Sequence, residues 1–96
     1  VKKLAAAMVS SNANYTDIKA IVESFVANLG FEMEITDSEN SIFIPGRCAD
    51  FTTTALDDKL PFTFKGFYGE VHPEIITNFD LEYPAVLFEV EFMERE

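Results

Sequence analysis

The spacing of apolar residues in the first third of the chain predicts one amphipathic helix. Its apolar positions fall on one stripe of a 3.6-residue period and are Ile18, Ile21, Val22, Phe25, Val26 and Leu29. Asn14 and Asp17 stand at capping-box spacing before this stripe, with Thr16 as a competing cap, and Gly30 follows as a C-cap. A helix is therefore expected between Asn14 and Gly30.

The apolar run Leu4 to Val9 leaves two interpretations open. Its three alanines favour a helix, whereas its length and its apolar character equally suit a buried strand.

Alternating patterns predict strands after the helix. Residues 31–36 place apolar side chains on one face and mostly acidic ones on the other. A short strand over residues 42–44 runs into Pro45 and Gly46, and residues 47–51 can continue extended, although Pro45 disfavours continuous central pairing. Thr52 to Lys59 has no period and is interpreted as a hairpin loop.

The last third of the chain predicts two more strands and a short helix. Phe62 and Phe64 alternate with polar residues, and the phase slip at residues 66–69 suggests a bulge between two glycines. Pro73 suits the first position of a helix that ends at Phe79, and residues 86–92 alternate as a final strand. The expected class is α+β, with helices flanking an antiparallel sheet in a single domain over residues 1–96.

Composition and charge narrow the function classes. The 96 residues include ten Phe, and 17 acidic residues against seven basic ones give a formal net charge of −10. Binding to a phosphate backbone needs clustered cations, and the one adjacent pair of basic residues is Lys2 with Lys3. The segment alone is therefore expected to bind RNA poorly.

Cysteine usage and hydropathy point to the cytosol. Cys48 is the single cysteine, so no internal disulfide can form. No continuous run of about 20 apolar residues exists, and no basic segment is followed by an apolar one as in a secretion signal. The chain begins with Val and stops shortly after a predicted strand, so an excised fragment is one expectation and a small independent paralogue is the other.

Three stretches together resemble the beta chain of archaeal and eukaryotic phenylalanyl-tRNA synthetase. They are residues 15–25 (YTDIKAIVESF), residues 43–50 (FIPGRCAD) and residues 66–81 (GFYGEVHPEIITNFDL), followed by Tyr83, Pro84 and the strand with Glu89. The residues proposed for interaction within these stretches are Pro45, Gly46, Arg47, Gly69, Glu70, His72, Pro73 and Glu89.

The resemblance implies a catalytic-like module with a degenerate class II synthetase fold that lacks the residues for ATP binding and amino-acid activation. The alpha chain would perform that chemistry with ATP and magnesium, in a heterotetramer that the beta module supports. The family's magnesium and editing residues lie in other parts of the beta chain, so no catalytic, cofactor or metal residue is assigned here. An independent ligand-binding or regulatory domain is the alternative, with its site near Arg47, Glu70 and His72.

Glu70 and His72 are two residues apart, which on a strand would point both side chains to one face. A metal site or an acid–base pair requires such convergence. The structural interpretation is that His72 caps the short helix and that Glu70 pairs with Arg47, and it is the favoured one.

Cys48 and the Pro45–Gly46–Arg47 turn also have two interpretations each. Cys48 would be a nucleophile if a neighbouring cation lowered its pKa, but a free cysteine is usually a small buried hydrophobe. The backbone N–H groups and the guanidinium of the turn suit an anion, yet the turn lacks the Lys and Ser or Thr of a phosphate loop. The structural interpretation is a turn whose Arg47 makes an ion pair.

The acidic strand faces offer a last candidate surface. It comprises Glu32, Glu34, Glu89 and Glu91. These residues form either a solvated face or a contact for a basic partner.

Overall fold

The computed structural model describes residues 2–57 and 59–94. Its elements are β1 (Lys2–Val9), α1 (Tyr15–Asn28), β2 (Phe31–Asp37), β3 (Phe43–Ala55), β4 (Phe62–Val71), α2 (Pro73–Asn78) and β5 (Ala85–Glu94). This order confirms the α+β class that the sequence pattern predicts.

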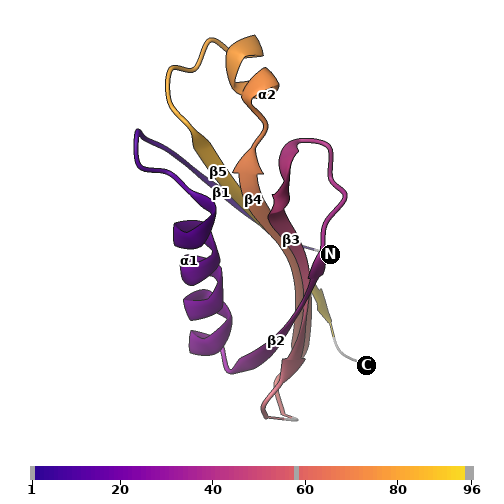
Figure 1. Ribbon diagram of the computed structural model, residues 1–96. Coiled ribbons are helices and arrows are strands. Elements are labelled where there is room, and N and C mark those ends of the chain that lie inside the picture. The colour runs from indigo at the N-terminus through magenta and orange to yellow at the C-terminus, as the bar shows by residue number, and fades with distance from the viewer. Residues whose placement is uncertain (1, 58, 95–96) are drawn as a thin grey trace.

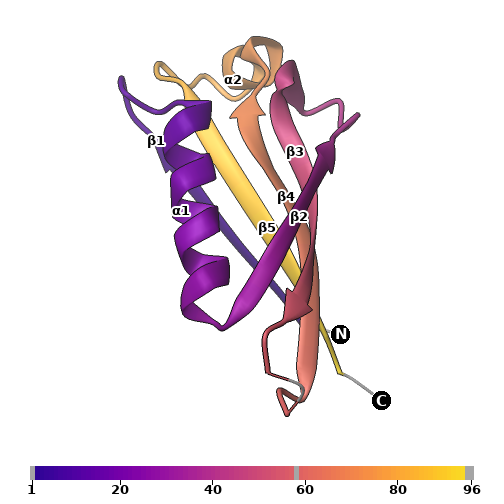
Figure 2. The same cartoon turned by 60° about the horizontal axis from the view of Figure 1, so that its bottom comes forward.

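The five strands form one antiparallel sheet in the order β1-β5-β4-β3-β2. Helix α1 lies along one face of this sheet, and α2 sits at one end of it (Figures 1 and 2). Over the described residues no helix covers the opposite face. One face of the sheet is therefore packed, and the other is open.

Helix α1 begins and ends where its capping residues predict. The Asn14 side chain accepts a hydrogen bond from the Asp17 amide at 2.9 Å, and Gly30 takes a left-handed φ of 86° just after the helix. Three residues of the expected stripe are fully buried, Ile18, Val22 and Val26. Ile21 is exposed instead, because it lies on the flank of that stripe.

The main core fills the space between α1 and the sheet. It is rich in aromatic rings, and the Phe31 and Phe64 centroids lie 4.8 Å apart in an edge-on contact. Two more aromatic residues, Phe51 and Tyr68, are buried beside them. The phenylalanines of the sequence thus serve mainly as packing.

The first apolar run is a strand, but it is not a buried one. All eight residues of β1 are exposed. The alanines of this run do not make it helical, because it pairs residue by residue with β5 from Lys2 with Phe92 to Val9 with Ala85. Tertiary pairing thus overrides helix propensity.

The loop expected over residues 52–59 is wrong in its first half. Residues 52–55 extend β3 and pair with residues 31–34 of β2, and only the remainder connects β3 to β4. The Thr53 hydroxyl also donates to the Phe64 carbonyl at 2.6 Å. Three consecutive threonines, each β-branched, suit a strand. Asp58, which belongs to the expected loop, lies outside the described residues.

The register break of the sheet lies at Pro45 and not between Gly66 and Gly69. Pairing of β3 with β4 shifts between Phe43 and Cys48, as the proline predicts. The predicted bulge in β4 is wrong, because Phe62 to Glu70 pair with β5 without a shift. Gly66 is instead needed for space, since a Cβ there would stand 2.1 Å from the Glu89 carbonyl oxygen.

Neither helix of the described residues is long and apolar enough to cross a membrane.

Candidate interaction site at one end of the sheet

Most of the residues selected from the sequence meet at the end of the sheet that carries α2. Pro45, Gly46 and Arg47 belong to the first part of β3, and Glu70 is the last residue but one of β4. Antiparallel pairing brings these two segments side by side, because Cys48 pairs with Gly69.

Glu70 connects three elements at this end. Its Oε1 accepts from Arg47 Nη1 at 3.3 Å, and its Oε2 accepts from the Tyr15 amide at 2.8 Å. The Glu70 side chain is 13% exposed, whereas that of Arg47 is 58% exposed. The expected pairing with Arg47 is confirmed. The bond to Tyr15 adds a role that the sequence did not reveal, because it supplies a negative charge to the N-terminus of α1.

His72 is committed to the start of α2. Its Nδ1 accepts from the Glu74 amide at 3.1 Å, and its own amide donates to the Ile42 carbonyl at 2.7 Å. Pro73 occupies the first turn of the helix, where its missing N–H costs nothing. The capping interpretation is confirmed. The described residues contain no group of three or more His, Cys, Asp or Glu that could hold a metal ion.

Two glycines allow the strands to meet here. Gly46 has a φ of 81°, which other residues adopt only with strain. A Cβ on Gly69 would lie 2.6 Å from the Cys48 Cβ and 2.8 Å from the Arg47 carbonyl oxygen. Cys48 itself is buried, and its Sγ donates to the Ser38 carbonyl at 3.6 Å. Its position is that of a packed side chain.

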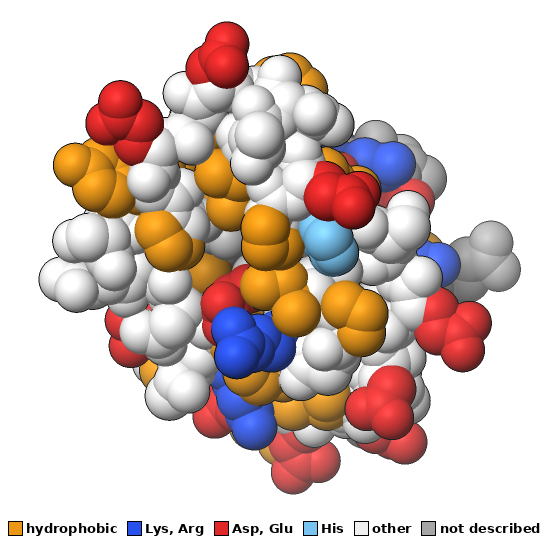
Figure 3. All heavy atoms as spheres, turned by 45° about the horizontal axis from the view of Figure 1, so that its top comes forward, with side chains coloured by type: hydrophobic (Ala, Val, Ile, Leu, Met, Phe, Trp, Pro, Cys, Tyr) orange, Lys and Arg blue, Asp and Glu red, His pale blue; other side chains and the backbone are white. Residues whose placement is uncertain are grey.

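A groove of about 400 Å³ opens between this strand end, α2 and the segment that leads into β5. Its lining includes Ile44, Arg47, Glu70, Ile76, Leu81 and Tyr83. Figure 3 shows this end of the molecule, where hydrophobic side chains surround a few charged ones. The side chains of Leu81 and Tyr83 are exposed, and Phe79 at the end of α2 is 74% exposed. This end therefore presents an apolar surface to solvent.

Sequence reasoning missed the residues after α2. Phe79 is the expected last residue of the short helix, and Leu81 ends the stretch 66–81 without an assigned role. The sequence does carry a signal for them. Phe79, Leu81 and Tyr83 are three large apolar residues within five positions of the connection between α2 and β5. Only the structure shows that the described neighbours leave them uncovered.

Glu89 does not belong to this end. It pairs with Phe67, which in turn pairs with Asp50, on the face of the sheet opposite α1. The alternation of each strand brings all four expected acidic residues to that same open face. A second groove of about 390 Å³ lies there, and its lining includes Asp50, Lys65, Phe67, Glu89 and Glu91.

Tyr68 is a buried polar residue that the sequence did not single out. It is 0% exposed beneath α1 and stacks on Tyr15, with centroids 5.7 Å apart. Its hydroxyl is the one buried side-chain polar atom without a hydrogen-bond partner among the described residues. Burial, and next the neighbouring Tyr15, raise the pKa of Tyr68 far above its ordinary value.

Comparison with known proteins gives consistent matches. The family model described as the phenylalanyl tRNA synthetase beta chain CLM domain matches residues 1–92. The phenylalanine–tRNA ligase beta subunit of Methanosphaera stadtmanae is 67% identical over 96 residues, which are 100% of this chain and 17% of the relative. That of Methanocaldococcus jannaschii is 43% identical over 91 residues, which are 95% of this chain and 15% of the relative.

A more distant relative gives the same picture. The beta subunit of Pyrococcus horikoshii is 36% identical over 88 residues, which are 92% of this chain and 15% of the relative. The chain thus spans about a sixth of the length of the curated relatives it matches.

Proposed function

Because the chain belongs to the phenylalanyl-tRNA synthetase beta chain family, we propose that it is a noncatalytic module that holds a cognate alpha chain in a phenylalanine–tRNA ligase. In this role the module supports the alpha-chain active site. The alpha chain joins Phe to its tRNA with ATP and magnesium, and this module carries none of that chemistry. The complex works in the cytosol.

The observation that carries the proposal is the apolar surface at the α2 end. Large apolar side chains exposed together are typical of protein–protein contacts, and aromatic residues dominate the energy of such contacts. Leu81 and Tyr83 line the groove there, and Phe79 stands next to them on the chain. Arg47 adds an exposed guanidinium to the same groove, held in place by Glu70.

The Arg47–Glu70 ion pair also argues for a rigid surface. Both carboxylate oxygens of Glu70 accept a hydrogen bond, one from Arg47 and one from the Tyr15 amide. Each oxygen thus already has a protein partner. A surface fixed in this way loses little conformational entropy when a partner binds. This favours a contact surface over a small-molecule site at Glu70.

Association with the cognate alpha chain tests the proposal. The 96-residue chain, shown to be folded by circular dichroism, is titrated with alpha chain and followed by calorimetry. We expect saturable binding, and Leu81→Ser and Tyr83→Ser should each weaken it by about tenfold, which corresponds to about 1.4 kcal/mol. A folded sample that does not bind the alpha chain would contradict the proposal.

Ile21→Ser is the matched control. Ile21 is exposed to a similar degree as Leu81, at 41% and 42%, but it lies on α1 and not in the groove. Its substitution should leave the dissociation constant unchanged. An equal loss in all three variants would show that the α2 end is not the contact surface.

A further inference from the structure

Arg47 is the one basic residue among the described residues that line the groove at the α2 end. The groove holds about 400 Å³, and apolar side chains such as Ile44, Leu81 and Tyr83 make up much of its wall. The Arg47 side chain is 58% exposed. At this end of the molecule, basic side chains lie beside hydrophobic ones (Figure 3). The groove thus offers a partner one accessible positive charge within an apolar surface.

Most hydrogen-bond donors of the Arg47 guanidinium are unused. A guanidinium presents several N–H donors in a planar fork that fits a carboxylate. Within residues 2–57 and 59–94, the Arg47 side chain makes a single hydrogen bond, from Nη1 to Glu70 Oε1 at 3.3 Å. This bond is longer than charge-assisted hydrogen bonds usually are. Glu70 therefore orients the fork, and the remaining donors are left for a ligand.

Glu70 offsets the charge of Arg47 only in part. Its second oxygen, Oε2, accepts from the Tyr15 amide at 2.8 Å, in the first turn of α1. The carboxylate therefore also faces the positive end of the helix dipole, which offsets part of its negative charge. The Glu70 side chain is 13% exposed, so little water reaches it. Arg47 thus keeps positive charge for a further anion.

Glu82 is the third charged residue that lines the groove in the described part of the chain. It is exposed, and within that part it forms no ion pair with Arg47. A carboxylate that enters the groove is attracted at Arg47 and repelled at Glu82. The two residues together therefore specify where a negative charge of the partner can lie.

The apolar rim of the groove is fixed in shape before any partner binds. At the end of α2, the Leu81 amide donates to the Ile76 carbonyl at 3.0 Å. The Asp80 amide donates to the Thr77 carbonyl at 3.0 Å, and Asp80 has a left-handed φ of 54°. This is the pattern of a Schellman motif, in which the apolar residues joined by the longer bond usually pack together. Those residues are Ile76 and Leu81, and both line the groove.

From these contacts we propose that the alpha chain presents a carboxylate, the side chain of an Asp or Glu, to Arg47 and packs apolar side chains around it. The inference rests on the proposed function and adds the chemistry that the partner brings to the same surface. A carboxylate can accept a pair of parallel hydrogen bonds from the guanidinium fork. The apolar rim excludes water once the partner is bound, and the lower local dielectric then strengthens this contact.

A double-mutant cycle tests the inference. In the 96-residue chain, Arg47→Met removes the charge and keeps most of the side-chain volume. In the alpha chain, each Asp is changed in turn to Asn and each Glu to Gln, and calorimetry measures the dissociation constant of every pair. Arg47→Met should weaken binding by at least about tenfold. One acidic substitution in the alpha chain should weaken binding to a similar extent, and the two changes together should weaken it little further.

Each other outcome overturns the inference. If Arg47→Met binds as tightly as the original chain, Arg47 is not part of the contact. If Arg47→Met weakens binding but its effect simply adds to that of every acidic substitution, the acceptor is an uncharged group and not a carboxylate. A folded original chain that does not bind the alpha chain at all overturns the proposed function as well, so the two failures are distinguishable.

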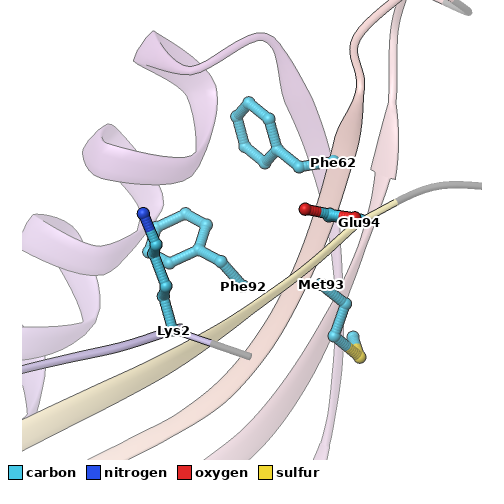
Figure 4. Close-up of a pocket in the computed structure, with 5 residues that line it drawn as sticks. All are labelled: Lys2, Phe62, Phe92, Met93 and Glu94. Atoms are coloured by element: carbon cyan, nitrogen blue, oxygen red, sulfur yellow. The ribbon is translucent and has the colours of Figure 1, made fainter.

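Lys2→Met is the matched control. Lys2 lies at the opposite end of the sheet, where its stem stands next to the Phe92 ring at a hollow of about 340 Å³ (Figure 4). Its substitution removes the same charge from an apolar surface outside the groove, so the dissociation constant should stay unchanged. Equal weakening by Lys2→Met and Arg47→Met would mean that only the net charge of the chain matters, and the inference would be wrong.

Discussion

The two edge strands of the sheet are built in opposite ways. Strand β2 follows α1 directly, and its first residue, Phe31, is 3% exposed beneath the helix. Its other face carries Glu32 and Glu34, charges that discourage pairing with a foreign strand. Strand β1 also has one hydrogen-bonded neighbour, β5, but no residue of it is buried and no charge interrupts residues 4–9.

This difference shows that hydrogen bonding and burial are separate contributions in a sheet. A ladder of backbone bonds gives β1 its regular form. The net stability from such bonds is modest, about 1 kcal/mol each, because water competes for the same groups. Burial under α1 makes β2 part of the core. The 96-residue domain should therefore depend strongly on β2 and only weakly on the side chains of β1.

The largest effect is expected at β2. Phe31→Ala should reduce the free energy of unfolding by about 3–5 kcal/mol, because it removes a buried ring that contacts Phe62 and Phe64. Urea denaturation followed by circular dichroism measures the change. Phe79→Ala is the matched control, since that ring is 74% exposed and its loss should change little. Equal losses for the two would refute the division between core and surface.

The next effect concerns how the N-terminus of α1 is held to β4. Glu70→Ala leaves the Tyr15 amide without its acceptor and should cost about 1–3 kcal/mol. Arg47→Met keeps most of the side-chain volume and removes an exposed partner, so it should cost less than about 1 kcal/mol. Thermal unfolding of the two variants compares them. A larger loss from Arg47→Met would mean that the ion pair, and not the bond to α1, holds this junction.

Tyr68 lies beneath α1, and removal of its hydroxyl should stabilise the folded chain. Tyr68→Phe eliminates a buried hydroxyl that has no hydrogen-bond partner within residues 2–57 and 59–94, and should raise the free energy of unfolding by about 1 kcal/mol. Calorimetry measures the gain. Tyr83→Phe is the control, because the Tyr83 side chain is half exposed. A loss of stability in Tyr68→Phe would show that the hydroxyl is satisfied.

The same variant has a defined pH dependence. The pKa of Tyr68 is raised in the folded chain, so above a pH of about 10 the unfolded chain ionises this hydroxyl while the folded chain keeps it neutral. Below that pH the ionisation of Tyr68 therefore does not affect the free energy of unfolding, which declines as the pH rises further. The alkaline decline in stability should be shallower in Tyr68→Phe than in the original chain.

The smallest effect is expected at β1. Leu4→Ala should cost the isolated chain less than about 1 kcal/mol, because nearly half of the side chain is already in water. Urea denaturation is again the measurement. A large loss in the isolated chain would mean that β1 is already packed.

Much of the candidate site could be predicted from local signals. The His72 cap follows from residue type and a short spacing, and the helix ends follow from Asn14 and Gly30. Glu70 and Arg47 are 23 positions apart, and their opposite charges suggest the pair. The groove could not be predicted, because it joins the β3 start, α2 and the segment before β5. These segments are distant in sequence, and only the register of the sheet places them together.

Local pattern alone was sufficient for the order of the elements after residue 9, the α+β class and the alternation of β5, because helix and strand periods are properties of neighbouring residues. Tertiary structure decided which strands lie at the edges and which apolar residues stay in water. The resemblance to a class II synthetase fold stays a prediction. For residues 4–9, helix propensity, apolar character and strand pairing pointed in different directions. Pairing with β5 settled their form, since backbone partners 76 to 86 positions away, from Val9 with Ala85 to Leu4 with Val90, have no signature in a short window of sequence.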